Sequence, residues 1–251
     1  DASSVHFGNG TGTLNFNHNN AGYNFATAIT GNGTVNILAG TTTLGATNSY
    51  SGETLVEGGE LKAGVSGAFS SSSAFVVNSG TLNFNNLDHS IAGLSGTGGT
   101  VSLGTAALTV NQAGDTSYAG VISGTGGLTK SGAGTLELTG ANTYSGGTTI
   151  SGGTLQGNTT SLQGNIVNNA ALVFDQSAAG TFAGMISGSG ALTKQGAGAL
   201  TLTGANSYGG GTTVTAGTLI GDTTSLQGNI VNDAALVFDQ SAAGTFAGMI
   251  S

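Results

Sequence analysis

The chain has 251 residues, of which 48 are glycine, 11 are acidic and three are lysine, and it contains no arginine, proline or cysteine. A net charge of −8 without a basic cluster argues against nucleic acid or an anionic membrane surface as a partner. The lack of cysteine excludes disulfides, thiolate metal sites and cysteine nucleophiles. We expect neither a signal peptide nor direct membrane insertion in this segment, because no long apolar run is present.

Short strand-like segments separated by Gly, Asn and Ser follow one another along the chain. Residues 135–139 and 199–203 alternate leucine with threonine, glutamate or alanine, which is the period of a half-buried strand. Helical periodicity is absent, and each glycine would cost a helix about 1 kcal/mol. We therefore predict an all-β protein. Further apolar runs bounded by turn-forming residues occur at 148–150, 153–155, 166–167 and 172–174.

A repeat of 64 residues organises the second half of the chain. Residues 154–187 return as 218–251 with only three changes, and residues 124–158 return as 188–222. Such self-similarity indicates a stacked array in which each unit completes the core of its neighbour. We expect one continuous solenoid, with regular repeats in 124–251 that stop in mid-repeat at Ser251.

The first half of the chain carries the same unit in eroded form. Residues 50–64 match 144–158, but Tyr50 and Tyr144 are 94 residues apart rather than 64. We therefore expect eroded repeats with insertions in 1–123. Loops projecting from the solenoid are predicted at 69–73 and 78–89, or at 15–24.

The length of the repeat favours a sequential parallel β-helix. Three strands of about five residues with turns of about two need about 21 residues per coil, and three coils would need about 63. Roughly 12 coils stacked at about 4.8 Å would form a rod of about 55–60 Å. The alternative is an antiparallel sandwich or barrel, in which the Gly-Gly pairs would be hairpin turns.

The pattern LTKSGAGTLELTGANTYSGGTTISGGTL at 128–155, with its near-copy at 192–219, resembles the autotransporter-associated β-strand repeat. This repeat occurs in passenger regions of Gram-negative type V secreted proteins. The resemblance implies a right-handed parallel β-helix and a C-terminal β-barrel translocator in the same precursor. It also implies display on the outer membrane at the bacterial cell surface, or secretion.

The expected function is that of a non-catalytic adhesin. Its partners would be host surface proteins or glycans, or another copy of itself, in aggregation or biofilm formation. A rod with repeated polar groups gains avidity from many weak contacts. The alternative is a structural stalk that presents an enzyme or toxin domain located elsewhere in the precursor. No catalytic, cofactor-binding or metal-binding residue is assigned.

The lysines and carboxylates of the repeat do not form a recognisable site. Lys130 follows a glycine-rich stretch, but Thr129 stands where a phosphate loop needs glycine, and no flanking helix is predicted. We expect Lys130 and Lys194 to be solvated on one face of the rod. Asp175 and Asp239, three coils or about 14 Å apart by this geometry, are too distant to share a calcium ion. The cluster of Glu53, Glu57 and Glu60 is expected to be a solvated edge.

The remaining candidate residues also favour a structural interpretation. No Ser-His-Asp arrangement or nucleophile elbow accompanies the three histidines, His6, His18 and His89, and mutation of Asp88, His89 and Asp115 would test for catalysis. Aromatic side chains recur in register and are expected to stack inside the coils, the alternative being an exposed ladder that binds sugar or a partner rod. Glycosylation sequons occur at Asn9, Asn32 and Asn158, but no glycan is assigned because the implied source is bacterial. The aromatic set comprises Tyr23, Tyr50, Tyr118, Tyr144, Tyr208, Phe174, Phe182, Phe238 and Phe246.

Overall fold

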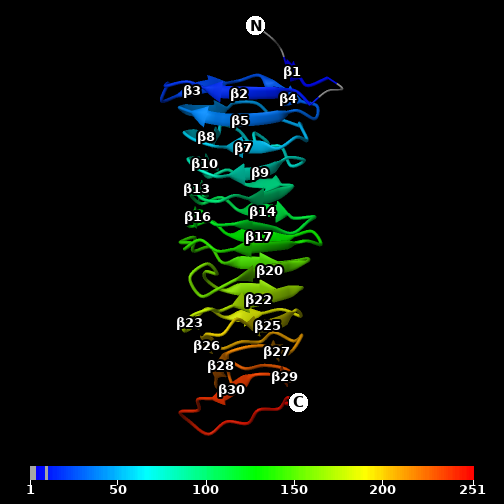
Figure 1. Ribbon diagram of the computed structural model, residues 1–251, viewed down its shortest axis with the longest axis vertical. Helices are drawn as coiled ribbons and strands as arrows, with labels where there is room; N and C mark the ends of the chain where they lie inside the picture. The colour runs from blue at the N-terminus through cyan, green and yellow to red at the C-terminus, as the bar shows by residue number, and fades with distance from the viewer. Residues whose placement is uncertain (1–3, 9–10) are drawn as a thin grey trace.

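The computed structural model describes residues 4–8 and 11–251, which form a straight rod with the chain ends at opposite tips (Figure 1). Within these ranges there are 30 strands and no helix. The strands pair in parallel between successive coils, so the fold is a parallel β-solenoid of about 12 turns, as predicted. The antiparallel alternative is wrong.

Three faces run along the rod, and the chain visits them in a fixed order. Faces 1, 2 and 3 are named here by their sheets. Face 1 contains a five-stranded and a seven-stranded sheet, joined by a parallel bridge between Gly96 and Tyr118. Together these sheets supply one strand at each of 12 levels.

The bounds of the strands are as follows. On face 1 they are β2 (Thr13–Asn17), β5 (Thr34–Ala39), β7 (Thr54–Val56), β9 (Ala74–Val77), β12 (Gly93–Ser95), β15 (Thr116–Tyr118), β18 (Thr135–Leu138), β20 (Thr154–Gly157), β22 (Ala171–Asp175), β25 (Ala191–Gln195), β27 (Thr212–Val214) and β29 (Ile230–Asn232). On face 2 they are β3 (Tyr23–Phe25), β6 (Thr41–Leu44), β8 (Glu60–Ala63), β10 (Thr81–Asn83), β13 (Thr100–Ser102), β16 (Val121–Ser123), β23 (Gly180–Phe182), β26 (Ala199–Leu202), β28 (Thr218–Gly221) and β30 (Ala235–Phe238). On face 3 they are β1 (Ser4–His6), β4 (Ala28–Thr30), β11 (His89–Ile91), β14 (Leu108–Asn111), β17 (Leu128–Ser131), β19 (Thr148–Ile150), β21 (Ile166–Asn168) and β24 (Ile186–Ser187).

Side chains alternate between the interior and the exterior of the rod along each strand. In β18, Leu136 and Leu138 are buried while Thr135 and Glu137 face outward, as the period of two predicts. The inward residues of all three faces form one continuous hydrophobic core along the rod. Burying one such leucine, isoleucine or phenylalanine contributes about 1.5–3 kcal/mol, so stability grows with every coil that is added.

The 64-residue repeat does not correspond to a whole number of coils. Leu128, Thr148, Ile166 and Ile186 are stacked partners on face 3, so three coils take 58 residues. Leu192, the repeat equivalent of Leu128, comes six residues later and lies in β25 on face 1. The predicted match between 64 residues and three coils is therefore wrong: one repeat is three coils plus one face.

Glycine is required where the chain turns from one face to the next. Gly188 has φ +101°, in the left-handed region that side chains disfavour, and a Cβ there would collide with the carbonyl oxygen of Asn168 on the preceding coil. Its repeat equivalent, Gly124, has φ +119°. These turns set the close stacking of the coils.

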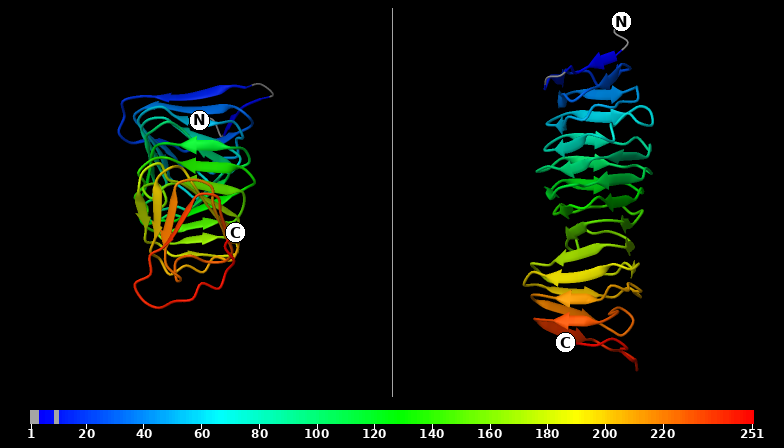
Figure 2. Two further views of the ribbon diagram at one scale, coloured as in Figure 1. Left: turned by 60° about the horizontal axis from the view of Figure 1, so that its bottom comes forward. Right: turned by 90° about the vertical axis from the view of Figure 1, so that its right-hand side faces the viewer.

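The predicted loops at 69–73 and 78–89 do not project. Phe69 is buried in the core, because its turn folds back over the open corner between two faces. Residues 78–89 contain β10, a turn with left-handed Asn85 and Asn86, and the start of β11, which together form an ordinary part of the stack. The turn at 18–22 is largely exposed, as Figure 2 shows at the N-terminal end. The division into 1–123 and 124–251 stays a prediction.

Candidate interaction surface

The two lysines of the repeat are buried, which corrects the prediction that they are solvated. Both Lys130 and Lys194 have no exposed surface. Lys130 Nζ donates hydrogen bonds to the carbonyl oxygens of Ser131 (2.8 Å), Gly132 (3.0 Å) and Gly152 (3.0 Å). Three carbonyl acceptors satisfy the three protons of an ammonium group, so the side chain closes a turn from within.

Lys194 repeats this arrangement on the next face. Its Nζ donates to the carbonyl oxygens of Gln195 (2.8 Å), Gly196 (2.7 Å) and Ala216 (3.0 Å). Burial lowers the pKa of Lys130 and of Lys194, and the nearby carboxylates of Asp115 and Asp175, respectively, act in the opposite direction. Neither lysine is available to a ligand at the surface.

Asparagine side chains in the repeat join three successive coils. Asn142 Oδ1 accepts a hydrogen bond from the N–H of Ile122 (2.8 Å), and its Nδ2 donates to the carbonyl oxygen of Ser161 (2.7 Å). Asn206 makes the same pair of bonds to Ile186 and Ser225. The asparagine therefore replaces backbone pairing where the chain turns a corner.

The tyrosines of the repeat lie inside the rod, as the stacked interpretation predicted. Tyr50, Tyr144 and Tyr208 are buried, and each hydroxyl lies 2.7–2.8 Å from the Oγ1 of the threonine four residues later. Tyr118 is also buried, whereas Tyr23 is 40% exposed. The characteristic residues of the repeat thus serve the fold, and an exposed aromatic ladder is not formed by the repeat tyrosines.

The residues considered for catalysis are not brought together. His6 and His18 each contact a threonine hydroxyl, at 2.8 and 2.9 Å, whereas His89 is buried. The carboxylates of Asp88 and Asp115 accept hydrogen bonds from backbone N–H groups one coil further along, those of Ala107 and Thr135 (both 2.7 Å). Within residues 4–8 and 11–251, no group of three His, Asp or Glu side chains could hold a metal ion.

The carboxylates that were compared across repeats lie on different faces. Asp175 ends β22 on face 1, whereas Asp239 follows β30 on face 2. The prediction that they lie in one line, three coils apart, is therefore wrong. Glu57 and Glu60 accept hydrogen bonds from Asn78 (2.9 Å) and Asn83 (2.6 Å) at the surface. Asn9 lies outside the described residues.

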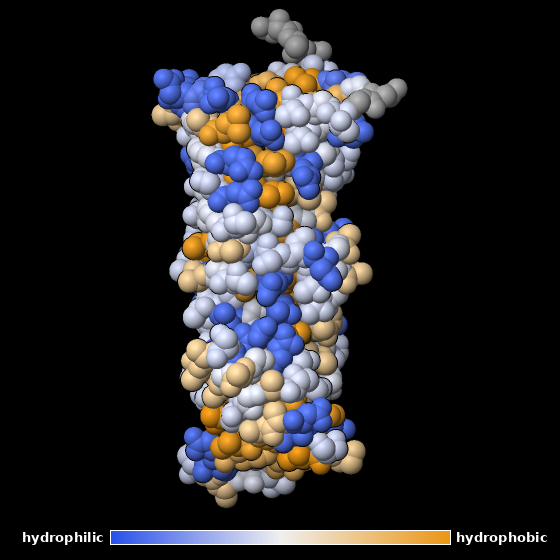
Figure 3. Space-filling view, in the orientation of Figure 1, coloured by the Kyte–Doolittle hydropathy of each residue, from blue (hydrophilic) through white to orange (hydrophobic). Residues whose placement is uncertain are grey.

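A band of carboxylate and amide groups crosses the outer side of face 1, and we call it the polar band. Gln156 Nε2 lies 3.2 Å from Glu137 Oε1 and 3.5 Å from Asp175 Oδ2, and Gln195 Nε2 donates to the same Asp175 oxygen at 3.2 Å. Figure 3 shows hydrophilic side chains gathered at the level of β20 and β22. The polar band consists of Glu137, Gln156, Asp175 and Gln195.

Two shallow hollows flank the polar band and share Glu137. Their volumes are about 390 Å³ and 220 Å³. Backbone hydrogen bonding from Thr135 lowers the pKa of Asp115, which lines the larger hollow, so this carboxylate stays charged near neutral pH. The larger hollow also contains Thr116, Ser117, Thr135 and Gln156, and the smaller contains Leu138, Thr139, Gly157, Asn158, Asp175 and Ser177.

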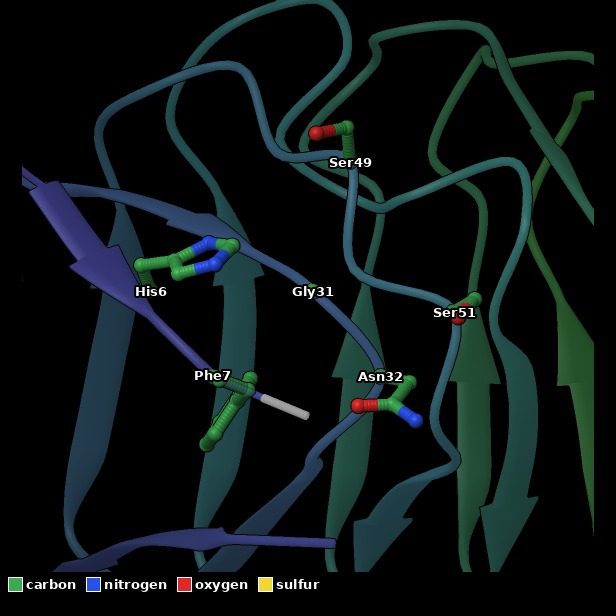
Figure 4. A pocket seen from close by; sticks show the side chains of 7 residues that line it. His6, Phe7, Gly31, Asn32, Ser49 and Ser51 are labelled. Atoms are coloured by element: carbon green, nitrogen blue, oxygen red, sulfur yellow. The ribbon is translucent and has the colours of Figure 1, made fainter. Parts of the chain in front are cut away.

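A third hollow, of about 480 Å³, lies near the N-terminal end (Figure 4). His6 and Asn32 face it from two neighbouring segments, with Ser49 and Ser51 on its far side. His6 is held by its bond to Thr30. This hollow, like the other two, is open and polar, and its walls can donate and accept hydrogen bonds.

Comparisons with known proteins agree with this architecture. The family model of the passenger-associated-transport-repeat matches residues 39–63, 128–156 and 192–220. Over 188 residues the chain is 45% identical to the adhesin BmaC autotransporter of Brucella suis biovar 1 (strain 1330). That alignment covers 72% of the chain and 5% of the relative, so the chain spans a small part of the relative's length.

A parallel β-solenoid built from these repeats defines the chain as passenger-type repeat sequence. The chain belongs to the passenger domains of type V autotransporters. Its location is the cell surface or the secreted fraction. The autotransporter context implies a C-terminal translocator in the precursor. No helix of the described residues is both long and apolar enough to cross a membrane.

Proposed function

We propose that this chain is a non-catalytic adhesive module of its passenger domain. It binds host surface proteins or glycans, or another copy of itself, and so promotes attachment, aggregation or biofilm formation. The named adhesin among its relatives supports this proposal. The exterior of the rod also supports it, because the hollows described above are shallow and open rather than enclosed.

One observation carries the proposal: the characteristic residues of the repeat point inward, and the outward positions are free to bind. Lys130, Asn142 and Tyr144 are all buried and hydrogen-bonded. The polar band, in contrast, presents Glu137 and Asp175 at the surface, where carboxylate oxygens can accept hydrogen bonds from hydroxyl or amide groups of a partner.

The screw arrangement of the repeats shapes how such binding would gain strength. Equivalent outward residues lie on successive faces, so a flat partner meets only one copy of a given group along one side of the rod. Several small partners, or a flexible chain passing around the rod, could engage successive copies. Linked weak contacts of this kind raise avidity without any new interaction.

A cell-adhesion assay tests the proposal. The precursor is displayed on an otherwise non-adherent bacterium, and the polar band is removed with Glu137→Ala, Gln156→Ala and Asp175→Ala. The matched control is Glu53→Ala, Glu57→Ala and Asn78→Ala, which also removes two carboxylates and one amide from the surface. We expect the first variant to lose attachment or clumping and the control to retain it.

Other outcomes separate the alternatives. If deletion of residues 124–187 abolishes adhesion but neither surface variant does, the binding surface lies elsewhere on these coils. If adhesion survives the deletion and both variants, the chain is a stalk that presents another domain of the precursor. The burial of the repeat residues favours this second function equally, because a stalk needs only a stable interior.

A further inference from the structure

One histidine lies inside the hydrophobic core. His89 begins β11 on face 3 and is only 6% exposed. Its ring centroid lies 4.8 Å from that of Phe69 and 5.6 Å from that of Phe84, and these two phenylalanines lie 5.2 Å apart. The imidazole thus packs as a member of an aromatic cluster that fills the interior between two coils.

The imidazole of His89 is incompletely paired. Its Nε2 is buried and has no hydrogen-bond partner. Around it, Phe69 precedes β9, Phe84 follows β10, and Leu108 of β14 is its stacked partner on the next coil. None of these three residues can ionise or compensate a charge.

Asp88 is the charged group that acts on His89. Its carboxylate raises the pKa of His89, but burial outweighs this effect and the pKa is lowered from its ordinary value of 6.5. Asp88 Oδ1 accepts a hydrogen bond from the N–H of Ala107 (2.7 Å) in an exposed position, so it is held toward the surface and away from the aromatic cluster. A proton on His89 would therefore place an unpaired charge in the core, which is unfavourable.

We propose that the coils around His89, residues 69–111, form an acid-sensitive joint in the rod. At neutral pH the uncharged imidazole completes the core. As the pH falls below about 6.5, the unfolded segment takes up a proton more readily than the folded one, so the local stability decreases until the pH reaches the lowered pKa of the folded state.

The opening is local because the coils of a solenoid contact only their neighbours. All three histidines lie in the first half of the chain, so the regular repeats from 124 onward contain no equivalent group. Their buried cations, Lys130 and Lys194, are already enclosed by carbonyl oxygens. Because the chain is displayed at the surface or secreted, the joint would respond directly to the pH of the surroundings.

Hydrogen exchange on the whole chain, measured by mass spectrometry at pH 7.5, 6.5, 5.5 and 4.5 and corrected for intrinsic rates, tests this proposal. We expect peptides within 69–111 to lose protection about tenfold or more as the pH falls, while peptides within 190–220 keep theirs. In His89→Phe or His89→Leu the acid-induced loss should disappear. The control His18→Asn, which alters a surface histidine, should behave as the wild type.

A second readout remains decisive if the core variants do not fold. NMR titration of the wild-type chain with labelled imidazoles reports each histidine directly, and we expect His89 to titrate at lower pH than His6 and His18. An ordinary or raised pKa for His89 would overturn the proposal. So would an acid-induced loss of protection of equal size in a folded His89 variant, because carboxylate protonation would then be the cause.

Discussion

The ammonium group of Lys130 lies 3.0 Å from the carbonyl oxygen of Gly152, which belongs to the next coil of the rod. This bond, with the two to Ser131 and Gly132, makes a lysine the internal closure of a turn. A cation in the interior of a solenoid is tolerated because three carbonyl dipoles replace its hydration shell.

Removing this cation should destabilise the rod. Lys130→Met keeps the aliphatic stem but leaves three carbonyl oxygens without their donor, and we expect a loss of about 2–4 kcal/mol in the free energy of unfolding. Urea denaturation measures the change. Lys62→Met, which alters the lysine of β8, is the control and should cost less than about 0.5 kcal/mol. An equal effect of the two substitutions would show that the carbonyl cage contributes nothing.

The asparagine that joins three coils should be equally sensitive. Asn142→Ala deprives the N–H of Ile122 and the carbonyl oxygen of Ser161 of their partners, and both losses occur at a buried corner. We expect a cost of about 2–4 kcal/mol and faster hydrogen exchange at Ile122. Thr143→Ala, at the exposed adjacent position, should be nearly neutral; a comparable loss there would point to the turn itself.

Alkaline pH should unfold the rod through its buried tyrosines. Burial raises the pKa of Tyr50 to about 12, and it also raises the pKa of Tyr118, Tyr144 and Tyr208. A folded-state pKa above the ordinary value of 10 means that the unfolded chain loses protons first, so stability is lost as the pH rises above 10.

The lowered pKa values of Lys130 and Lys194 act with the opposite sign, adding stability as the pH approaches 10.5. Circular dichroism between pH 8 and 12 should show the net loss. Tyr50→Phe should reduce the dependence on pH above 10, although it removes the hydroxyl contact with Thr54. An unchanged pH profile in this variant would contradict the assignment.

One whole repeat should be removable without loss of the fold. Deleting residues 124–187 joins Ser123 to Gly188, and both native junctions have the same Ile-Ser-Gly sequence with glycine in the left-handed region. We expect a folded rod shorter by about 16 Å, at about 4.8 Å per coil, with all later residues moved to the next face. Small-angle scattering measures the length. Deletion of residues 124–177 joins unlike positions and should fold poorly; equal stability of the two would show that repeat register is unimportant.

The sequence by itself determined the fold class and the family. Alternation of leucine and threonine, glycine at the corners and the 64-residue recurrence are local features, because each coil repeats the same short-range choices of strand and turn. The number of coils and the burial of the tyrosines followed from the same pattern. For the same reason the sequence indicated where the repeats begin, but not how they align along the rod.

Only the tertiary structure decided which outward and inward positions meet. Coil length varies with each turn, and an error of two residues per coil accumulates to a whole face over three coils, so the screw relation between Leu128 and Leu192 could not be read from the period. Lys130 looked like a surface residue because its acceptors are backbone carbonyl oxygens on another coil, which no side-chain pattern records. The polar band and the aromatic cage of His89 have the same origin: both join residues about 20 positions apart that become neighbours only when the coils stack.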